Sequence, residues 1–188
     1  MSAVARRAVF LDRDGVLNRA IVRDGKPYSP ATLAELEIPA DVPGALSELK
    51  RAGFLLIGAT NQPNVARGIQ SREVVVAINE RLRAQLPLDD LLVCFHDDAD
   101  DCDCRRPRPG LLLLGAARHG VDLAASVMIG DRWKDIEAGH RAGCATVLID
   151  HRYREVGWEG RRPDFTTDSL SGATAWVLRT LEGGRGAT

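Results

Sequence analysis

The sequence lacks three features that would place the protein in a broad functional class. It has no charge surplus, because 25 lysines and arginines are balanced by 26 aspartates and glutamates, so no net field attracts it to nucleic acid or to an anionic membrane. It has no apolar run close to the roughly 20 residues that a membrane-spanning helix needs. The opening segment MSAVARRAVF has no apolar stretch typical of a secretory signal. We therefore expect a cytoplasmic protein that binds neither nucleic acid nor membrane.

The length indicates a single domain. A chain of 188 residues falls within the roughly 100–200 residues usual for one domain, and it is long enough to bury a full hydrophobic core. We expect one domain over residues 1–182, followed by a flexible tail over residues 183–188. We also expect a monomer or a weak oligomer.

Short apolar segments recur along the chain and predict strands of a parallel sheet. Their hydrophobicity is continuous rather than alternating, which is typical of strands covered on both faces; the segments are 8–12, 54–60, 91–95, 126–131 and 144–150. Apolar residues at helical spacing lie between them over 42–49 and 74–82, and a last helix is expected over about 170–181. Strands that alternate with helices predict an α/β fold, a three-layer Rossmann-like sandwich with a central parallel sheet.

Polar residues stand where these predicted strands end, and ligands bind at the carboxyl ends of strands in such sheets. Asp12 and Asp14 follow the first strand at positions i and i+2, which share a face in an extended chain. Two carboxylates on one spot favour a hard divalent cation such as Mg²⁺, although aspartates that form a turn are an equally good interpretation of this pair alone. Thr60 and Asp131 end two other strands, where each is either a ligand-binding group or a helix cap.

Three of the four cysteines cluster with a histidine in the segment CFHDDADDCDC. Three sulfurs and one imidazole form a closed tetrahedral set for a structural zinc ion; the predicted ligands are Cys94, His96, Cys102 and Cys104. The alternative is a set of unrelated cysteines. A calcium loop starting at Asp97 is excluded, because its sixth position is Cys102 rather than glycine. We expect the aspartates of this loop to solvate it.

Four motifs in the chain, DRDGVL, TNQ…ARG, CDCRRPRPG and GDRWKD, together resemble the haloacid dehalogenase-like phosphohydrolases. Within that family they most resemble the small subgroup that contains heptose 1,7-bisphosphate 7-phosphatase and histidinol-phosphate phosphatase. The resemblance runs from about Val9 to Leu181. The chain departs from the subgroup at Arg106, where lysine is usual; arginine keeps the charge but is a wide fork rather than a compact ammonium.

The resemblance implies a role for each matching residue. Asp12 is the nucleophile that takes the phosphoryl group, and Asp14 is the general acid and base. Thr60 and Arg106 bind the oxygens of the transferring phosphoryl group. The carboxylates of Asp12 and Asp131 hold Mg²⁺ together with the backbone carbonyl of Asp14. Four further residues are candidates to contact substrate: Asn61, Gln62, Arg105 and Arg132.

The intervals between the motifs leave no room for a separate cap domain. Predicted helices, strands and the zinc loop fill the chain from Asp14 to Thr60 and from Thr60 to Arg106. We therefore expect an open site whose walls are residues 23–30, residues 61–68 and the zinc loop. The zinc would fix the direction of the arginines that follow Cys104, which preorganises positive charge for a phosphate.

These observations favour a Mg²⁺-dependent phosphatase that hydrolyses a sugar phosphate through an aspartyl phosphate. Its partner would be a small phosphorylated metabolite, and the nearest alternative is histidinol phosphate. A polynucleotide end phosphatase would suit an open site, but the chain lacks the basic tract expected for backbone contacts. A zinc-stabilised binding scaffold is a different class, and the complete set of motif aspartates argues against it.

Overall fold

A computed structural model describes residues 6–154 and 160–182 of the chain; the predicted tail at 183–188 lies outside them. The core of the fold is a six-stranded sheet in the order β5-β4-β1-β6-β7-β8, and all neighbouring strands are parallel. Its strands are β1 (Ala8–Leu11), β4 (Leu55–Asn61), β5 (Asp90–Cys94), β6 (Val127–Gly130), β7 (Ala145–Ile149) and β8 (Phe165–Thr167). The edge strand β8 was not predicted, because the segment FTT has no apolar run.

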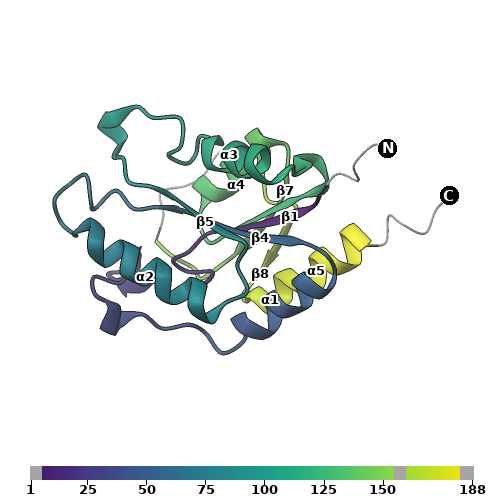
Figure 1. The fold of residues 1–188 in the computed structure, drawn as a ribbon, viewed down its shortest axis with the longest axis horizontal. Helices are drawn as coiled ribbons and strands as arrows, with labels where there is room; N and C mark the ends of the chain where they lie inside the picture. The colour runs from purple at the N-terminus through teal and green to yellow at the C-terminus, as the bar shows by residue number, and fades with distance from the viewer. Residues whose placement is uncertain (1–5, 155–159, 183–188) are drawn as a thin grey trace.

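Helices cover both faces of this sheet, which confirms the predicted three-layer sandwich (Figure 1). One face carries α1 (Val42–Arg51), α2 (Arg72–Gln85) and α5 (Leu170–Glu182), and the other carries α3 (Gly110–His119) and α4 (Trp133–Ala142). Three short 3-10 turns, η1 (Leu33–Glu35), η2 (Asp98–Asp100) and η3 (Leu123–Ala125), lie in the connections. None of these helices is long and apolar enough to span a bilayer.

The continuous apolar character of β1 is explained by its central place in the sheet. Val9 and Leu11 pack in the core beneath α1 and α5, whereas Ala8 and Phe10 pack in the core beneath α3. Successive side chains of a strand point to opposite faces, so a central strand must be apolar at every position. Each fully buried leucine or phenylalanine contributes about 1.5–3 kcal/mol, and all four of these β1 side chains are inaccessible to solvent.

The topology brings three strand ends together. The chain passes from β1 to β4 and β5 on one side, and then returns to place β6 on the other side of β1. The carboxyl ends of β4, β1 and β6 are therefore neighbours at the point where the strand order reverses, which is where ligands bind in such sheets.

A small antiparallel hairpin, β2 (Ile21–Arg23) and β3 (Lys26–Tyr28), extends from the loop that follows β1. Its turn is Asp24-Gly25, and both residues have positive φ, 51° and 75°. Two successive residues with positive φ are the signature of the tight turns that suit hairpins, and an Asp-Gly pair favours them. The segment was predicted only as a wall of the site, because its strands are too short to show a periodic pattern.

Candidate active site

Three buried aspartates meet at the reversal point of the sheet. Asp12 follows β1, Asp131 follows β6, and Asp135 lies in the first turn of α4. Their exposed fractions are 6%, 4% and 2%, and one carboxylate oxygen of each lies within 4.8 Å of the others. Asp12 and Asp131 were predicted to meet here, whereas Asp135 was not assigned to the site. The sequence feature that could have assigned Asp135 to the site is its position one helical turn after Asp131.

Two glycines allow the carboxylates to come so close. Gly15 has φ +89°, and a Cβ there would collide with the carboxylate of Asp131. A Cβ at Gly130 would collide with the side chain of Asp135. A glycine at each position therefore lets the backbone approach an acidic side chain that any other residue would displace.

A single buried guanidinium, that of Arg106, bridges two of these carboxylates. Its Nη2 donates to Oδ1 of Asp12 at 2.7 Å, and its Nη1 forms an ion pair with Asp135. Arg106 is 3% exposed. Burial favours its neutral form, but the charges of Asp12 and Asp135 outweigh this and raise the pKa of Arg106. The group is therefore a permanent cation, and it compensates one of the three negative charges.

Asp131 and Asp135 both bind a proton more tightly than an isolated carboxyl group does. Burial raises the pKa of Asp131 well above the usual range, and the charges of Asp12 and Asp135 raise it further, while the nearby hydroxyl of Tyr153 opposes the shift. Burial also raises the pKa of Asp135 to about 7, although Arg106 opposes the shift. Within the described residues no hydrogen bond of standard geometry reaches either carboxylate oxygen of Asp131, whereas Asp135 accepts bonds from the backbone N–H groups of Asp131 and Arg132 at 3.2 and 3.0 Å. A divalent cation would satisfy both the charge of the cluster and the oxygens of Asp131.

Asp14 occupies a separate network on the edge of the same cavity. Both of its carboxylate oxygens accept bonds of 3.0 Å from Arg13, and further bonds come from Ser29 at 2.7 Å, Gln62 at 2.9 Å and Asn18 at 3.0 Å. Burial alone would raise the pKa of Asp14, but the charge of Arg13 and these hydrogen bonds lower it below the usual value. Its carboxylate is held ionised in a fixed orientation, and it is not part of the cluster of three.

Arg13 was not predicted as a site residue. It is the largest fully buried side chain of the described residues, and its Nη1 donates to Asn79 of α2 at 2.9 Å. In an extended chain the residue between Asp12 and Asp14 points away from them, so the pattern gave no signal. The turn after β1 breaks that alternation and brings Arg13 back onto Asp14.

The side chains at the end of β4 form hydrogen bonds to one another, to Asp14 and to Arg106. Thr60 is 1% exposed, and its Oγ1 accepts a bond of 2.9 Å from Gln62. Asn61 bonds to the backbone N–H and C=O of Arg106 at 3.3 Å each. Gln62 does not line the cavity but links Thr60 to Asp14. The structure thus places Gln62 behind the wall, where it orients two other residues.

The motif aspartates, Thr60 and Arg106 line a cavity of about 600 Å³. Two of the predicted walls contribute to it, through residues 26–29 of the hairpin and through Asn61, Pro63, Asn64 and Arg67; on the third side the lining residue is Arg105, which follows the zinc loop. Arg132 lines it as well, as predicted. Three further lining residues were not assigned to substrate, namely Trp133, Lys134 and Arg154. Trp133 and Lys134 open α4 and Arg154 follows β7, so only the fold brings them to this rim.

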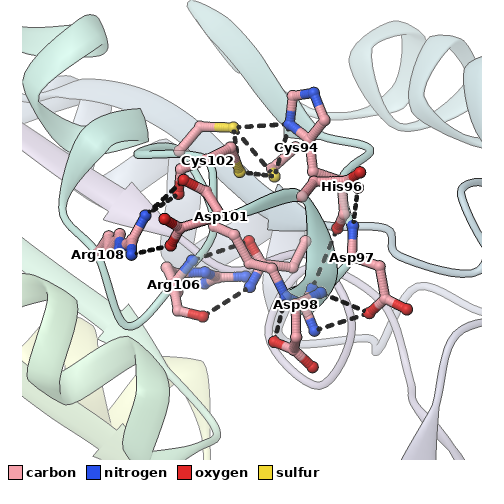
Figure 2. A network of polar contacts seen from close by, with 12 residues as sticks. Cys94, His96, Asp97, Asp98, Asp101, Cys102, Arg106 and Arg108 are labelled. Carbon is pink, nitrogen blue, oxygen red and sulfur yellow. Dashed lines mark hydrogen bonds and ion pairs between the residues drawn. The ribbon is translucent and has the colours of Figure 1, made fainter.

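The predicted zinc ligands converge beside the cavity (Figure 2). One ligand atom from each residue lies within 4.8 Å of the others, and all of the cysteines are free of disulfides; the four residues are Cys94, His96, Cys102 and Cys104. Sulfur–sulfur separations run from 3.1 to 3.7 Å. Burial raises the pKa of Cys104, and the two neighbouring sulfurs raise it further. A tetrahedral zinc ion would hold these sulfurs as thiolates, so the residues fit the metal.

The aspartates of the zinc loop do more than the predicted solvation. Asp98 accepts a bond from Nε of Arg105 at 2.7 Å, and Asp97 accepts one from Nε of Arg67 at 2.7 Å (Figure 2 shows both aspartates). Arg67 comes from the loop after β4, so this ion-pair network ties two cavity walls together. The side chains of Asp101 and Asp103 are largely exposed, in keeping with the predicted solvation, whereas the bond from Arg67 was not predicted because that arginine comes from another loop.

Comparisons with known proteins agree with this geometry. A family model described as HAD-hydrolase-like matches residues 103–173. The chain is 34% identical over 151 residues to D-glycero-beta-D-manno-heptose-1,7-bisphosphate 7-phosphatase of Pseudomonas aeruginosa, covering 78% of this chain and 82% of that protein. The chain belongs to the haloacid dehalogenase-like hydrolases. Among its relatives in this family, the heptose 1,7-bisphosphate 7-phosphatase of Thermosynechococcus vestitus is 32% identical, and the match covers 94% of this chain and 97% of that enzyme.

The fold is shared with family members of known structure. Heptose 1,7-bisphosphate phosphatase from B. bronchiseptica, solved with magnesium and phosphate, superposes with a TM-score of 0.74 at 28% identity over 93% of this chain and 98% of that one. A haloacid dehalogenase-like phosphatase from Mesorhizobium loti gives a TM-score of 0.71 at 29% identity over 94% of this chain and 88% of that one. The sheet whose strand order reverses at the acidic cluster is therefore of the kind found in haloacid dehalogenase-like phosphatases.

Proposed function

We propose that this haloacid dehalogenase-like hydrolase is a Mg²⁺-dependent phosphatase that cleaves a sugar phosphate monoester through an aspartyl phosphate. The observation that carries the proposal is the cavity floor, where the carboxylate of Asp12 bonds to the buried Arg106 and lies close to two other buried carboxylates. A carboxylate held beside a fixed cation can act as the nucleophile towards a phosphoryl group.

The proposed reaction uses Asp12 and Asp14 in turn. A carboxylate oxygen of Asp12 attacks phosphorus, and the bond between phosphorus and the sugar oxygen breaks. Asp14 gives its proton to the leaving alkoxide. A water then attacks the aspartyl phosphate while Asp14 takes the water's proton, so that Asp12 is regenerated and inorganic phosphate leaves. Thr60 and Arg106 would donate hydrogen bonds to the phosphoryl oxygens as charge develops on them.

The magnesium would be held by Asp12, Asp131 and the backbone carbonyl of Asp14. Asp131 is the strongest candidate ligand because both of its oxygens are buried and, within the described residues, no backbone N–H group bonds to them. Asp135 already accepts two backbone N–H bonds and forms an ion pair with Arg106. Its role would therefore be to hold Arg106 in place rather than to bind the metal. When bound, Mg²⁺ offsets the charge on the phosphoryl oxygens.

The ionised state of Asp14 has a consequence for its acid role. Arg13 and the hydrogen bonds lower its pKa, which favours the base that the second half-reaction requires. Its role as an acid requires a proton that arrives with the substrate or from water in the cavity. The structure therefore gives more support to Asp14 as the base of the second half-reaction than as the acid of the first.

The curated relatives favour a heptose 1,7-bisphosphate as the substrate over histidinol phosphate, because those named here act on the heptose compound by name. The described residues form one six-stranded sheet covered by helices on both faces, with a two-stranded hairpin attached, which supports a single domain over residues 1–182. A cytoplasmic location, a monomeric or weakly oligomeric state and the absence of nucleic-acid or membrane partners stay predictions from the sequence.

The test is a panel of phosphate esters ranked by kcat/KM in the presence of Mg²⁺. It would include heptose 1,7-bisphosphate, a hexose bisphosphate, histidinol phosphate and p-nitrophenyl phosphate. We expect the heptose bisphosphate to rank first and chelation of Mg²⁺ to abolish turnover of every ester. A preference for histidinol phosphate would assign the alternative substrate, and inactivity towards all four esters would refute the phosphatase.

Arg106 should tolerate lysine but not a neutral residue. Arg106→Gln removes the cation that compensates Asp12 and Asp135, and we expect kcat/KM to fall by about 10²–10³-fold, as for loss of one preorganised donor. Arg106→Lys keeps the charge without the fork and should remain within about tenfold of the wild type. Steady-state kinetics with p-nitrophenyl phosphate measures both. Arg108→Gln, in an exposed ion pair with Asp101 on the same loop, is the matched control. Equal losses in the glutamine and lysine variants would contradict the assigned role.

We also propose that Zn²⁺ bound by the four clustered ligands positions the arginines and takes no part in the chemistry. The loop from Cys94 to Cys104 leads directly into Arg105 and Arg106, and its aspartates hold Arg105 and Arg67. Ligation of its ends would therefore fix two cavity walls at once.

Removal of zinc should weaken substrate binding while Mg²⁺ stays essential. We expect KM to rise about tenfold, which corresponds to about 1.4 kcal/mol, and the melting temperature to fall. Metal content by mass spectrometry, kinetics and thermal unfolding would be measured before and after chelation. Readdition of Zn²⁺ should restore both values, whereas Mg²⁺ alone should not. Zinc-free protein with unchanged KM would exclude the positioning role.

A further inference from the structure

Some of the cationic side chains that line the cavity form ion pairs with acidic residues, and others do not. Arg106 on the floor is paired with Asp12 and Asp135. Arg67 and Arg105 on the zinc-loop side are paired with Asp97 and Asp98. The zinc-loop wall therefore offers a second anion little uncompensated charge, although its two arginines line the cavity.

Two further cations that line the cavity are Lys26 and Arg154; Lys134 of α4 lines it too, with its ammonium group near the ring of Trp133. Neither the side chain of Lys26 nor that of Arg154 forms an ion pair or hydrogen bond anywhere within residues 6–154 and 160–182. Lys26 begins β3 of the hairpin, and Arg154 follows β7, so they come from segments far apart in the sequence.

Two contacts join these segments and fix the pair. The backbone N–H of Arg154 donates to the carbonyl of Gly25 at 2.8 Å. The stem of Arg154 lies against Gly25, where a Cβ would approach its Cγ and Cδ to 2.8 and 2.9 Å. Gly25 also supplies the positive φ of the hairpin turn. The turn thus places Lys26 immediately after the residue on which Arg154 rests.

We propose that Lys26 and Arg154 form an anion subsite that holds the second phosphate of a bisphosphorylated substrate. This inference rests on the proposed function, since the floor of the cavity would take the phosphoryl group that reacts. A substrate with two phosphates needs positive charge at two places, and within residues 6–154 and 160–182 no acidic side chain pairs with Lys26 or Arg154. Hydrogen bonds to charged groups are the stronger class, so the subsite would select bisphosphates over monophosphates through KM.

The experiment compares three substrates in four variants. The substrates are heptose 1,7-bisphosphate, heptose 7-phosphate and p-nitrophenyl phosphate, and the variants are Lys26→Gln, Arg154→Gln, the double variant and Arg152→Gln. Arg152 lies two residues before Arg154 but lines a different cavity, so it is the matched control. For the bisphosphate we expect KM to rise about fivefold in each single variant and about 20-fold in the double variant, the range of exposed charge contacts. The two other substrates, and Arg152→Gln, should stay within about twofold.

The outcomes separate this inference from the proposed function. Wild-type protein that hydrolyses none of the three esters would refute the function itself. Wild-type protein that is active, with a bisphosphate KM unchanged in the double variant, would overturn the subsite alone. Equal losses on heptose 7-phosphate and on the bisphosphate would also overturn it, because a second-phosphate subsite cannot act on a substrate that has one phosphate.

Discussion

Asp12→Asn should have no measurable turnover of any phosphate ester. The amide keeps the size of the side chain and one oxygen for Arg106, but it is a very poor nucleophile and cannot form the acyl phosphate. Loss of a nucleophile removes the whole covalent route, so we expect kcat to fall by about 10⁴-fold or more. Steady-state kinetics with p-nitrophenyl phosphate and with a sugar phosphate measures the loss.

A matched control shows that the loss comes from the site. Asp150 also follows a strand of the sheet, but it is exposed and lies outside the cavity, so Asp150→Asn should retain the wild-type rate. The Asp12 variant should keep its melting temperature, because the substitution lowers the repulsion among three buried carboxylates and leaves an amide oxygen for Arg106. Near-normal turnover in a preparation free of deamidated protein would refute Asp12 as the nucleophile.

Asp14→Asn should lose activity in a way that depends on the leaving group. With a sugar phosphate the leaving alkoxide needs a proton, so both half-reactions suffer, and kcat should fall by about 10²–10⁴-fold. With p-nitrophenyl phosphate the nitrophenolate leaves without a proton, and the first half-reaction should survive. The aspartyl phosphate would then accumulate, because no base activates the water. We expect a burst of nitrophenol, about one per active site, followed by slow turnover.

The burst distinguishes a catalytic role of Asp14 from a structural one. Asp14 is the partner of the fully buried Arg13, so the variant should also melt at a lower temperature. Stopped-flow measurement scales the burst to the folded fraction, which removes the effect of stability. A variant that hydrolyses both esters at the wild-type rate, or that loses both equally and shows no burst, would contradict the assignment of Asp14 as general acid and base.

The pKa directions of the buried cluster indicate why the metal and the cation are both needed. Burial and mutual repulsion raise the pKa of Asp131 and Asp135, so a chain without a divalent ion would hold a proton on this cluster near neutral pH. Binding of Mg²⁺ should displace that proton. The acidic limb of the Mg²⁺-binding curve therefore reports on these carboxylates, with affinity rising as pH rises through their pKa.

Much of the fold was predictable because its signals are local. The apolar runs of β1, β4, β5, β6 and β7 predicted the strands, since a strand buried on both faces is apolar at every position. The zinc ligands were predictable for a similar reason: four ligand atoms on a short loop can meet around one ion with little help from the rest of the chain. The edge strand β8 and the hairpin escaped prediction, because segments of three residues carry no period.

The sequence by itself predicted the five apolar strands of the sheet, the cluster of three cysteines with His96, and the places of the two motif aspartates, Asp12 and Asp131, at strand ends. Only the tertiary structure decided which groups meet: Arg106 bridges Asp12 and Asp135, Arg13 folds back onto Asp14, and the backbone of Arg154 bonds to Gly25, next to Lys26. Periodicity depends on neighbours within a few residues, and a sequence displays it directly. The partner of a charged group depends on which loops emerge side by side from the sheet, and strand order and turn direction settle that only once the chain has folded.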